Sequence, residues 1–192
     1  MSLRFSLLTL PVLATALGAS ALSTPALPAQ DAAAELLAVG TQAPDFTLTT
    51  VTANGRTATP FRLSEHRGEI VVLAFFPKAR TSGCTAQMHT YRDKYASMFR
   101  NGQKVRLIGI STDDDADLVA WAKDDKFPFL LGADTDKAVG KLFGAANITG
   151  FHRRYLYVIG PDGKIAYATN FRAMAQDAYD DLDAAIKKIA VR

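Results

Sequence analysis

Hydrophobic residues along this chain form two kinds of pattern, which alternate from one segment to the next. Continuous apolar runs rich in β-branched and aromatic residues predict strands buried on both faces, the clearest being EIVVLAFF at 69–76. Apolar residues three or four positions apart predict helices, and turn sequences such as Asn54-Gly55 and Pro161-Asp162-Gly163 predict hairpins. The predicted strands are 46–51, 57–63, 69–76, 105–111, 128–131, 155–159 and 164–169, and the predicted helices are 85–100, 113–126, 136–143 and 176–191.

This order of elements predicts an α/β domain whose central sheet has helices on both faces. The 192 residues are enough for one domain with a short appendage. Hydrophobic residues make up 48% and charged residues 21%, which excludes a disordered, collagenous or low-complexity chain. The net charge of +3 comes from 22 basic and 19 acidic residues of interleaved sign, so we expect no nucleic-acid partner.

Residues 1–23 have the layout of a secretory signal peptide, with Arg4 ahead of an apolar run and small residues after it. The run, 5–19, is shorter than the roughly twenty residues of a membrane-spanning helix, which favours cleavage over an uncleaved anchor. Residues 24–38 are rich in Ala, Pro and Gln and are interpreted as a linker, so the folded domain is expected at 39–192. The sequence thus predicts an exported protein, periplasmic or secreted, with no membrane attachment after cleavage.

Candidate chemistry centres on Cys84, the only cysteine of the chain. A single thiol excludes an internal disulfide and a structural zinc site built on several thiolates. Cys84 follows the predicted strand 69–76 after a short loop and lies where the next helix begins. Unpaired N–H groups and the positive end of the helix dipole favour the thiolate there, which is the reactive form of cysteine. The alternative is a buried cysteine with a packing role only.

The loop before this cysteine supports a reactive role. It contains Pro77, Thr81 and Cys84 in the pattern P-x-x-x-T-x-x-C, which resembles the active-site signature of the peroxiredoxins, the AhpC/TSA superfamily. Pro77 ends the strand and, without an N–H group, can cover the thiolate without competing for it. The Thr81 hydroxyl is close enough along the chain to hydrogen-bond the thiolate or a peroxide, with helix capping as its alternative. Gly83 has no side chain to obstruct a substrate.

Three further segments resemble the same superfamily. They are VGTQAPDF at 39–46, GISTD at 109–113 and the hairpin sequence RRYLYVIGPDGKI that begins at Arg153. By its spacing to Gly160, Arg154 matches the arginine that in this superfamily lies beside the sulfur, and Arg153 is the rival. A guanidinium there would stabilise the thiolate and hold the peroxide. The resemblance implies a thioredoxin-like fold with a central mixed sheet, and it covers essentially the whole predicted domain.

The active-site helix resembles most closely that of the peroxiredoxin Q type, also called bacterioferritin comigratory protein. Many members of this subgroup carry a second, resolving cysteine five residues after the first, where this chain has His89. At about 100° per residue, position 89 lies roughly 140° around the helix from Cys84, so no contact with the sulfur is expected. The resemblance therefore implies a cycle that uses Cys84 alone.

The implied activity is thiol-dependent reduction of hydrogen peroxide and organic hydroperoxides, in which Cys84 becomes a sulfenic acid. Arg154, Thr81 and the N–H groups at the start of the helix would orient the peroxide. An external thiol, either a thioredoxin-like protein or a small thiol, would then restore the cysteine. The resemblance implies no metal and no organic cofactor, and a monomer or a homodimer.

Two other functions remain open at this point. An exported thioredoxin-like thiol–disulfide oxidoreductase would have a similar fold, but it normally uses C-x-x-C, and here Thr81 occupies the first position. A redox-inactive binding module is the third interpretation. The loop signature together with Arg154 favours the peroxidase. The three histidines are His66, His89 and His152, and they are scattered along the sequence. We expect them to have surface or packing roles and not to bind a metal.

Overall fold

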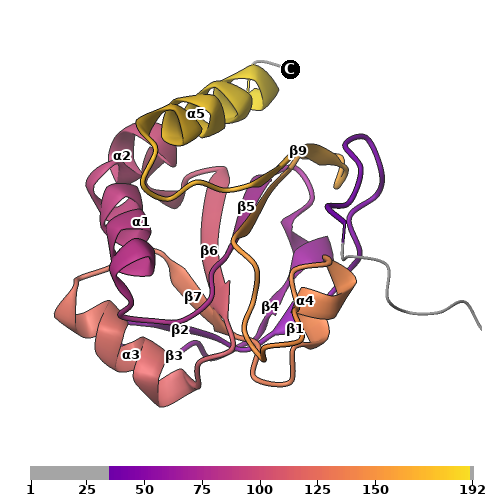
Figure 1. The fold of residues 1–192 in the computed structure, drawn as a ribbon. Coiled ribbons are helices and arrows are strands. Elements are labelled where there is room, and N and C mark those ends of the chain that lie inside the picture. The colour runs from indigo at the N-terminus through magenta and orange to yellow at the C-terminus, as the bar shows by residue number, and fades with distance from the viewer. Residues whose placement is uncertain (1–34, 191–192) are drawn as a thin grey trace, which may run out of the picture. The chain divides into compact units, whose positions relative to one another are not determined.

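The computed structural model describes residues 35–190. Its centre is a seven-stranded sheet in the order β3-β2-β7-β6-β5-β8-β9, with a separate two-stranded sheet of β1 and β4 (Figure 1). The strands are β1 Thr47–Leu48, β2 Thr50–Thr52, β3 Gly55–Arg56, β4 Phe61–Arg62, β5 Ile70–Phe75, β6 Val105–Ser111, β7 Leu130–Ala133, β8 Tyr155–Ile159 and β9 Ile165–Asn170. The helices are α1 Ser82–Asp93, α2 Tyr95–Met98, α3 Asp115–Asp124, α4 Ala138–Leu142 and α5 Gln176–Ala190, with 3-10 turns η1 Leu63–His66 and η2 Arg100–Gly102. The predicted signal peptide and most of the predicted linker lie outside the described residues, so export stays a prediction from the sequence.

The run EIVVLAFF forms β5, an interior strand of the sheet. All residues of β5 are buried, and it pairs in parallel with β6 and antiparallel with β8. β6 pairs in parallel with β7, while β2, β3 and β9 add antiparallel pairs toward the two edges. The continuous apolar run reflects burial on both faces of a central strand. The predicted mixed sheet is confirmed.

Each face of the sheet carries its own apolar core. Successive side chains of an extended chain point to opposite faces, so Phe75 and Phe76 enter different cores. The first core contains Phe76 with buried residues of α1, α3 and α5, and the second contains Phe75 with residues of α4, β1 and β4. Figure 1 shows α1 and α3 on one side of the sheet and α4 on the other. Helices cover both faces, as predicted, and Cys84 belongs to the first core.

Some predicted elements have different bounds in the structure. The helix predicted at 85–100 begins earlier, at Ser82, and is divided into α1 and α2 because Lys94 departs from helical geometry, with φ −97° and ψ 11°. The strand predicted at 128–131 begins at Leu130, since Pro128 cannot donate a ladder hydrogen bond. The two strands predicted at 46–51 and 57–63 do not form one hairpin. Their segments form β2 and β3, which pair in the seven-stranded sheet, and β1 and β4, which pair in the two-stranded sheet.

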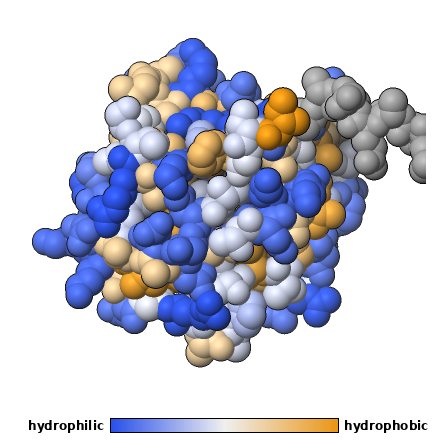
Figure 2. Space-filling model, turned by 60° about the horizontal axis from the view of Figure 1, so that its bottom comes forward, coloured by the Kyte–Doolittle hydropathy of each residue, from blue (hydrophilic) through white to orange (hydrophobic). Residues whose placement is uncertain are grey.

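The first described residues already contact the domain. Leu36 and Leu37 pack against the second core, and Leu37 N donates to the Tyr157 hydroxyl at 3.2 Å. These contacts precede the domain start predicted at residue 39. The face shown in Figure 2 is mostly hydrophilic, with hydrophobic residues scattered among polar ones. Within residues 35–190, no helix combines the length and the apolarity needed to cross a bilayer.

Candidate active site

Cys84 is the third residue of α1 and is fully buried. The loop 76–81 joins the C-terminal end of β5 to the start of α1. The first backbone hydrogen bond of this helix runs from Thr85 N to Thr81 O at 2.8 Å. The N–H groups of Ser82, Gly83 and Cys84 therefore precede the helical hydrogen-bond ladder. Negative charge on the sulfur is stabilised by these groups and by the helix dipole.

Arg154 reaches the sulfur from the position just before β8. Its Nη2 donates to Cys84 Sγ at 3.2 Å. The backbone of Arg154 is held by Phe171, whose N–H donates to the Arg154 carbonyl at 2.7 Å. A guanidinium carries a permanent positive charge and five N–H donors, so it can stabilise a thiolate and still donate to an oxygen of a substrate.

Arg153, the rival arginine in the sequence, is directed elsewhere. Its Nη1 donates to Ala146 O at 2.7 Å, and its backbone N–H donates to Ala145 O at 2.6 Å. The two guanidinium groups are thus hydrogen-bonded to different segments, and Arg154 is the one that contacts residues of α1. The geometry brings Arg154, and not Arg153, to Cys84.

Gln87 is the residue of this site that the sequence reasoning missed. It lies about one helical turn after Cys84, is fully buried, and its Oε1 accepts a hydrogen bond from Arg154 Nη1. Its Nε2 donates to the Tyr91 hydroxyl at 2.9 Å. Burial raises the pKa of Tyr91 and outweighs the opposing effect of Gln87, so the phenol is neutral. The sequence signal for Gln87 was a polar residue on the buried face of a helix, because a buried polar side chain needs a polar partner.

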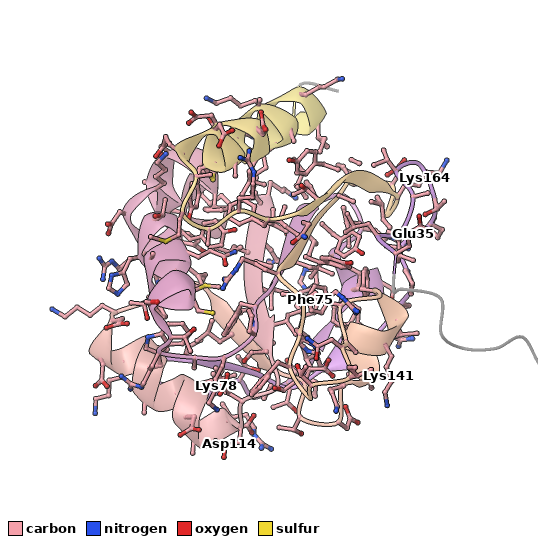
Figure 3. All side chains as sticks on the ribbon, viewed as in Figure 1. Glu35, Phe75, Lys78, Asp114, Lys141 and Lys164 are labelled. Atoms are coloured by element: carbon pink, nitrogen blue, oxygen red, sulfur yellow. The ribbon has the colours of Figure 1, made fainter. Side chains whose placement is uncertain are left out.

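The loop before α1 is attached to the end of β6 through Asp113, which is 6% exposed. Asp113 Oδ2 accepts hydrogen bonds from Ala79 N at 2.8 Å and from Ser111 Oγ at 2.9 Å, and Lys78 Nζ donates to Oδ1 at 3.1 Å. The hydrogen bond and charge of Asp113 raise the pKa of Lys78. Figure 3 shows Lys78 between α1 and α3. The path of the loop, and with it the start of α1, depends on this carboxylate.

Thr81 is the N-cap residue of α1, but its side chain makes no capping hydrogen bond. Its Oγ1 instead donates to Lys78 O at 2.9 Å, inside the loop that Asp113 holds. Because the hydroxyl proton is engaged there, the lone pairs of Oγ1 are left to accept a hydrogen bond. This arrangement suits a substrate that carries an O–H group.

Pro77 and Gly83 shape the approach to the sulfur. Pro77 follows the last apolar residue of the β5 run and is half-buried. A Cβ on Gly83 would lie 3.4 Å from Arg154 Nη2, so the absence of a side chain leaves room for the arginine. Of the predicted site residues, the structure brings Cys84 and Arg154 into direct contact. It places Pro77 and Thr81 in the loop that precedes α1 and Cys84.

We expect Asp113→Ala to lower the free energy of unfolding by about 1.5–3 kcal/mol, because Ala79 N and Ser111 Oγ lose their charged acceptor. Denaturant unfolding followed by circular dichroism measures this loss. Asp124→Ala is the matched control, since Asp124 also binds the loop, through Arg80 Nη2 at 2.6 Å, but in an exposed pair. That variant should lose less than about 1 kcal/mol. Equal losses in the two variants would contradict the role given to Asp113.

The histidines lie beside three different carboxylates. His66 Nδ1 is 3.0 Å from Glu69 Oε2, His89 Nε2 is 3.1 Å from Asp125 Oδ2, and His152 Nε2 is 3.0 Å from Asp134 Oδ2. Within the part of the chain that the structure describes, no three His, Cys, Asp or Glu side chains gather as possible metal ligands. The His89 ring packs against Phe127 with 6.1 Å between ring centroids. His89 is thus directed toward the end of α3.

Residues 39–168 match the model of the AhpC/TSA family. The chain belongs to the AhpC/TSA family. A relative named "Peroxiredoxin Q, chloroplastic" from Triticum aestivum is 37% identical over 133 residues, which cover 68% of this AhpC/TSA chain and 58% of that protein. The match therefore spans less than two thirds of the relative's length. It places the chain in the peroxiredoxin Q-like part of the AhpC/TSA family.

Solved structures share the fold of this AhpC/TSA chain. Peroxidoxin BcpB from Mycobacterium tuberculosis superposes with a TM-score of 0.67 at 27% identity, covering 79% of this chain and 97% of that one. Peroxiredoxin Q from Xanthomonas campestris superposes with a TM-score of 0.64 at 24% identity, covering 76% and 91% of the two chains. These neighbours confirm the predicted thioredoxin-like fold.

Proposed function

We propose that this chain is a thiol peroxidase that reduces hydrogen peroxide and organic hydroperoxides through Cys84. The observation that carries the proposal is the Arg154 guanidinium 3.2 Å from a fully buried sulfur at a helix N-terminus. Both the guanidinium and the helix N-terminus favour the thiolate. Membership of the AhpC/TSA family supports peroxide as the oxidant. A substrate must reach a buried sulfur beside Gly83, which favours a small molecule.

In the proposed reaction, the Cys84 thiolate attacks one oxygen of the peroxide. The S–O bond forms as the O–O bond breaks, the sulfur is oxidised to a sulfenic acid, and the departing oxygen takes up a proton and leaves as water or an alcohol. Arg154 and the N–H groups at the start of α1 stabilise negative charge on that oxygen. Thr81 Oγ1 accepts a hydrogen bond from the peroxide and so helps to orient it.

The second half of the proposed cycle uses an external thiol. Its sulfur attacks the sulfenic acid, water leaves, and the mixed disulfide is then opened by another thiol to restore Cys84. No other cysteine exists in the chain to take this role. Position 89, where many peroxiredoxin Q proteins carry the resolving cysteine, holds a histidine, whose Nε2 lies 3.1 Å from Asp125 Oδ2. The reductant is a thioredoxin-like protein or a small thiol.

The function is tested by measuring peroxide consumption with dithiothreitol as reductant, beside the reduction of insulin disulfides. A thiol peroxidase accelerates peroxide consumption but does not accelerate the reduction of insulin beyond the rate with dithiothreitol alone. Accelerated insulin reduction without accelerated peroxide consumption would indicate a thiol–disulfide oxidoreductase instead. Absence of both activities would indicate a binding module, and either of these results would contradict the proposal.

After one equivalent of peroxide and without external thiol, we expect a dimedone-type reagent to label Cys84 nearly completely. The sulfenic acid should persist because α1 brings no second thiol to it. Intact-protein mass spectrometry measures the label. In His89→Cys, part of the label should be replaced by an internal disulfide, to the extent that α1 can open. Rapid loss of the sulfenic acid from the wild type, without thiol and without overoxidation, would rule out the one-cysteine cycle.

A further inference from the structure

A second buried polar pair, formed by Asp134 and His152, lies on the other side of the sheet from α1. Both residues are 1% exposed, and Asp134 Oδ2 lies 3.0 Å from His152 Nε2. Asp134 follows β7 directly, and its N–H donates to Ser111 O, at the end of β6, at 2.8 Å. His152 precedes Arg154 by two residues. The pair therefore connects the ends of two parallel strands to the segment that carries the arginine of the site.

Asp134 is held in place from the α4 side. Its Oδ1 accepts a hydrogen bond from Val139 N at 3.0 Å, and its Oδ2 accepts one from Gly140 N at 2.7 Å. Burial alone would raise the pKa of Asp134, but the neighbouring His152 and these two N–H groups lower it on balance. The carboxylate is therefore charged at neutral pH and offers a fixed anchor for the histidine.

Besides its contact with Asp134, the His152 ring packs against Phe75 and Gly140. It meets the ring of Phe75 edge to face, with 5.4 Å between centroids. It also lies against Gly140, where a Cβ would overlap the ring. Residue 152 forms a β-bridge with Ala146, and Ala146 N donates to Gly140 O at 3.0 Å. Asp134 thus supports both His152 and, through Gly140, the segment to which His152 is bridged.

We propose that His152, held by Asp134, is a positioning residue that sets where the Arg154 guanidinium meets Cys84. This inference rests on the proposed peroxidase function. Two residues of extended chain span at most about 7 Å, so a shift at position 152 is passed on directly to Arg154. Displacement of a group at the reacting atoms by about 1 Å is enough to slow a reaction strongly. A buried ring confined by an anion, an aromatic ring and a glycine backbone suits this task.

The test is a double-mutant cycle on the single-turnover oxidation of Cys84 by hydrogen peroxide. His152→Gln should slow oxidation about tenfold when Arg154 is present, a coupling typical of residues that act together. In an Arg154→Ala background the same substitution should have less than about a twofold effect on the rate, because His152 is proposed to act on Cys84 only through Arg154. Equal slowing in both backgrounds, or no slowing in either, would overturn the proposal.

The matched control is His66→Gln. His66 also lies beside a carboxylate, Glu69, at 3.0 Å, and stacks on Phe61 with 4.4 Å between centroids, but it belongs to η1. We expect Cys84 in the His66→Gln variant to be oxidised at the wild-type rate. If His152→Gln does not fold, Asp134→Asn, which preserves the side-chain shape, is used in the same cycle. A wild type that peroxide does not oxidise contradicts the proposed function, whereas an oxidised wild type with additive substitutions contradicts only the role of His152.

Discussion

Replacing Cys84 with serine should lower the rate of peroxide consumption by more than about a thousandfold, the least expected when a covalent nucleophile is removed. A serine hydroxyl at this position is not ionised at neutral pH, whereas the helix N-terminus and Arg154 stabilise a thiolate. No other cysteine is available to replace it. Peroxide consumption with dithiothreitol in excess, measured beside the wild type, gives the ratio.

The same measurement on Cys84→Ala separates chemistry from folding. Cys84 is fully buried in the first core, so a hydroxyl there could disturb packing, while alanine keeps the site apolar. Both variants should show a cooperative thermal unfolding transition and should lack activity. A folded variant that retains most of the wild-type rate would mean that Cys84 is not the group that peroxide oxidises.

The fold was predictable because its strongest signals are local. The run at 69–76 has the composition of a strand with two buried faces, and it forms β5, an interior strand of the sheet. Other strand pairings depend on contacts between segments distant in the sequence, which no local pattern reveals. The runs around Asn54 predicted one hairpin, yet β1 and β4 form a sheet of their own, because their partners are decided by packing over the second core.

The candidate site was predictable in part for the same reason. Cys84 could be placed at a helix start from its distance to β5, and Arg154 came from resemblance to a family and not from any local pattern. The contact of Gln87 with Arg154 joins residues far apart in the sequence, so spacing within α1 could not reveal it. The pairing of His152 with Asp134 is equally non-local.

The structure explains how two segments distant in the sequence are held at one sulfur. Asp113 follows β6 and holds the cysteine loop, while Asp134 follows β7 and holds the segment before β8. β6 and β7 are parallel neighbours, so both carboxylates lie at the same edge of the sheet, which is where α/β folds place their chemistry. Each carboxylate fixes one partner of the contact between Cys84 and Arg154.

Arg154→Ala should slow the oxidation of Cys84 by about a hundredfold, since removal of a preorganised donor from a developing charge costs that much in comparable sites. Arg153→Ala should slow it by less than about threefold, because its guanidinium donates to Ala146 O and not to the sulfur. Arg154→Lys should fall between the two, as it keeps the charge but cannot contact Cys84 and Gln87 together. Single-turnover oxidation at several peroxide concentrations measures all three variants. The reverse order for Arg153 and Arg154 would show that the arginine beside Cys84 in the reduced protein is not the one that acts on the peroxide.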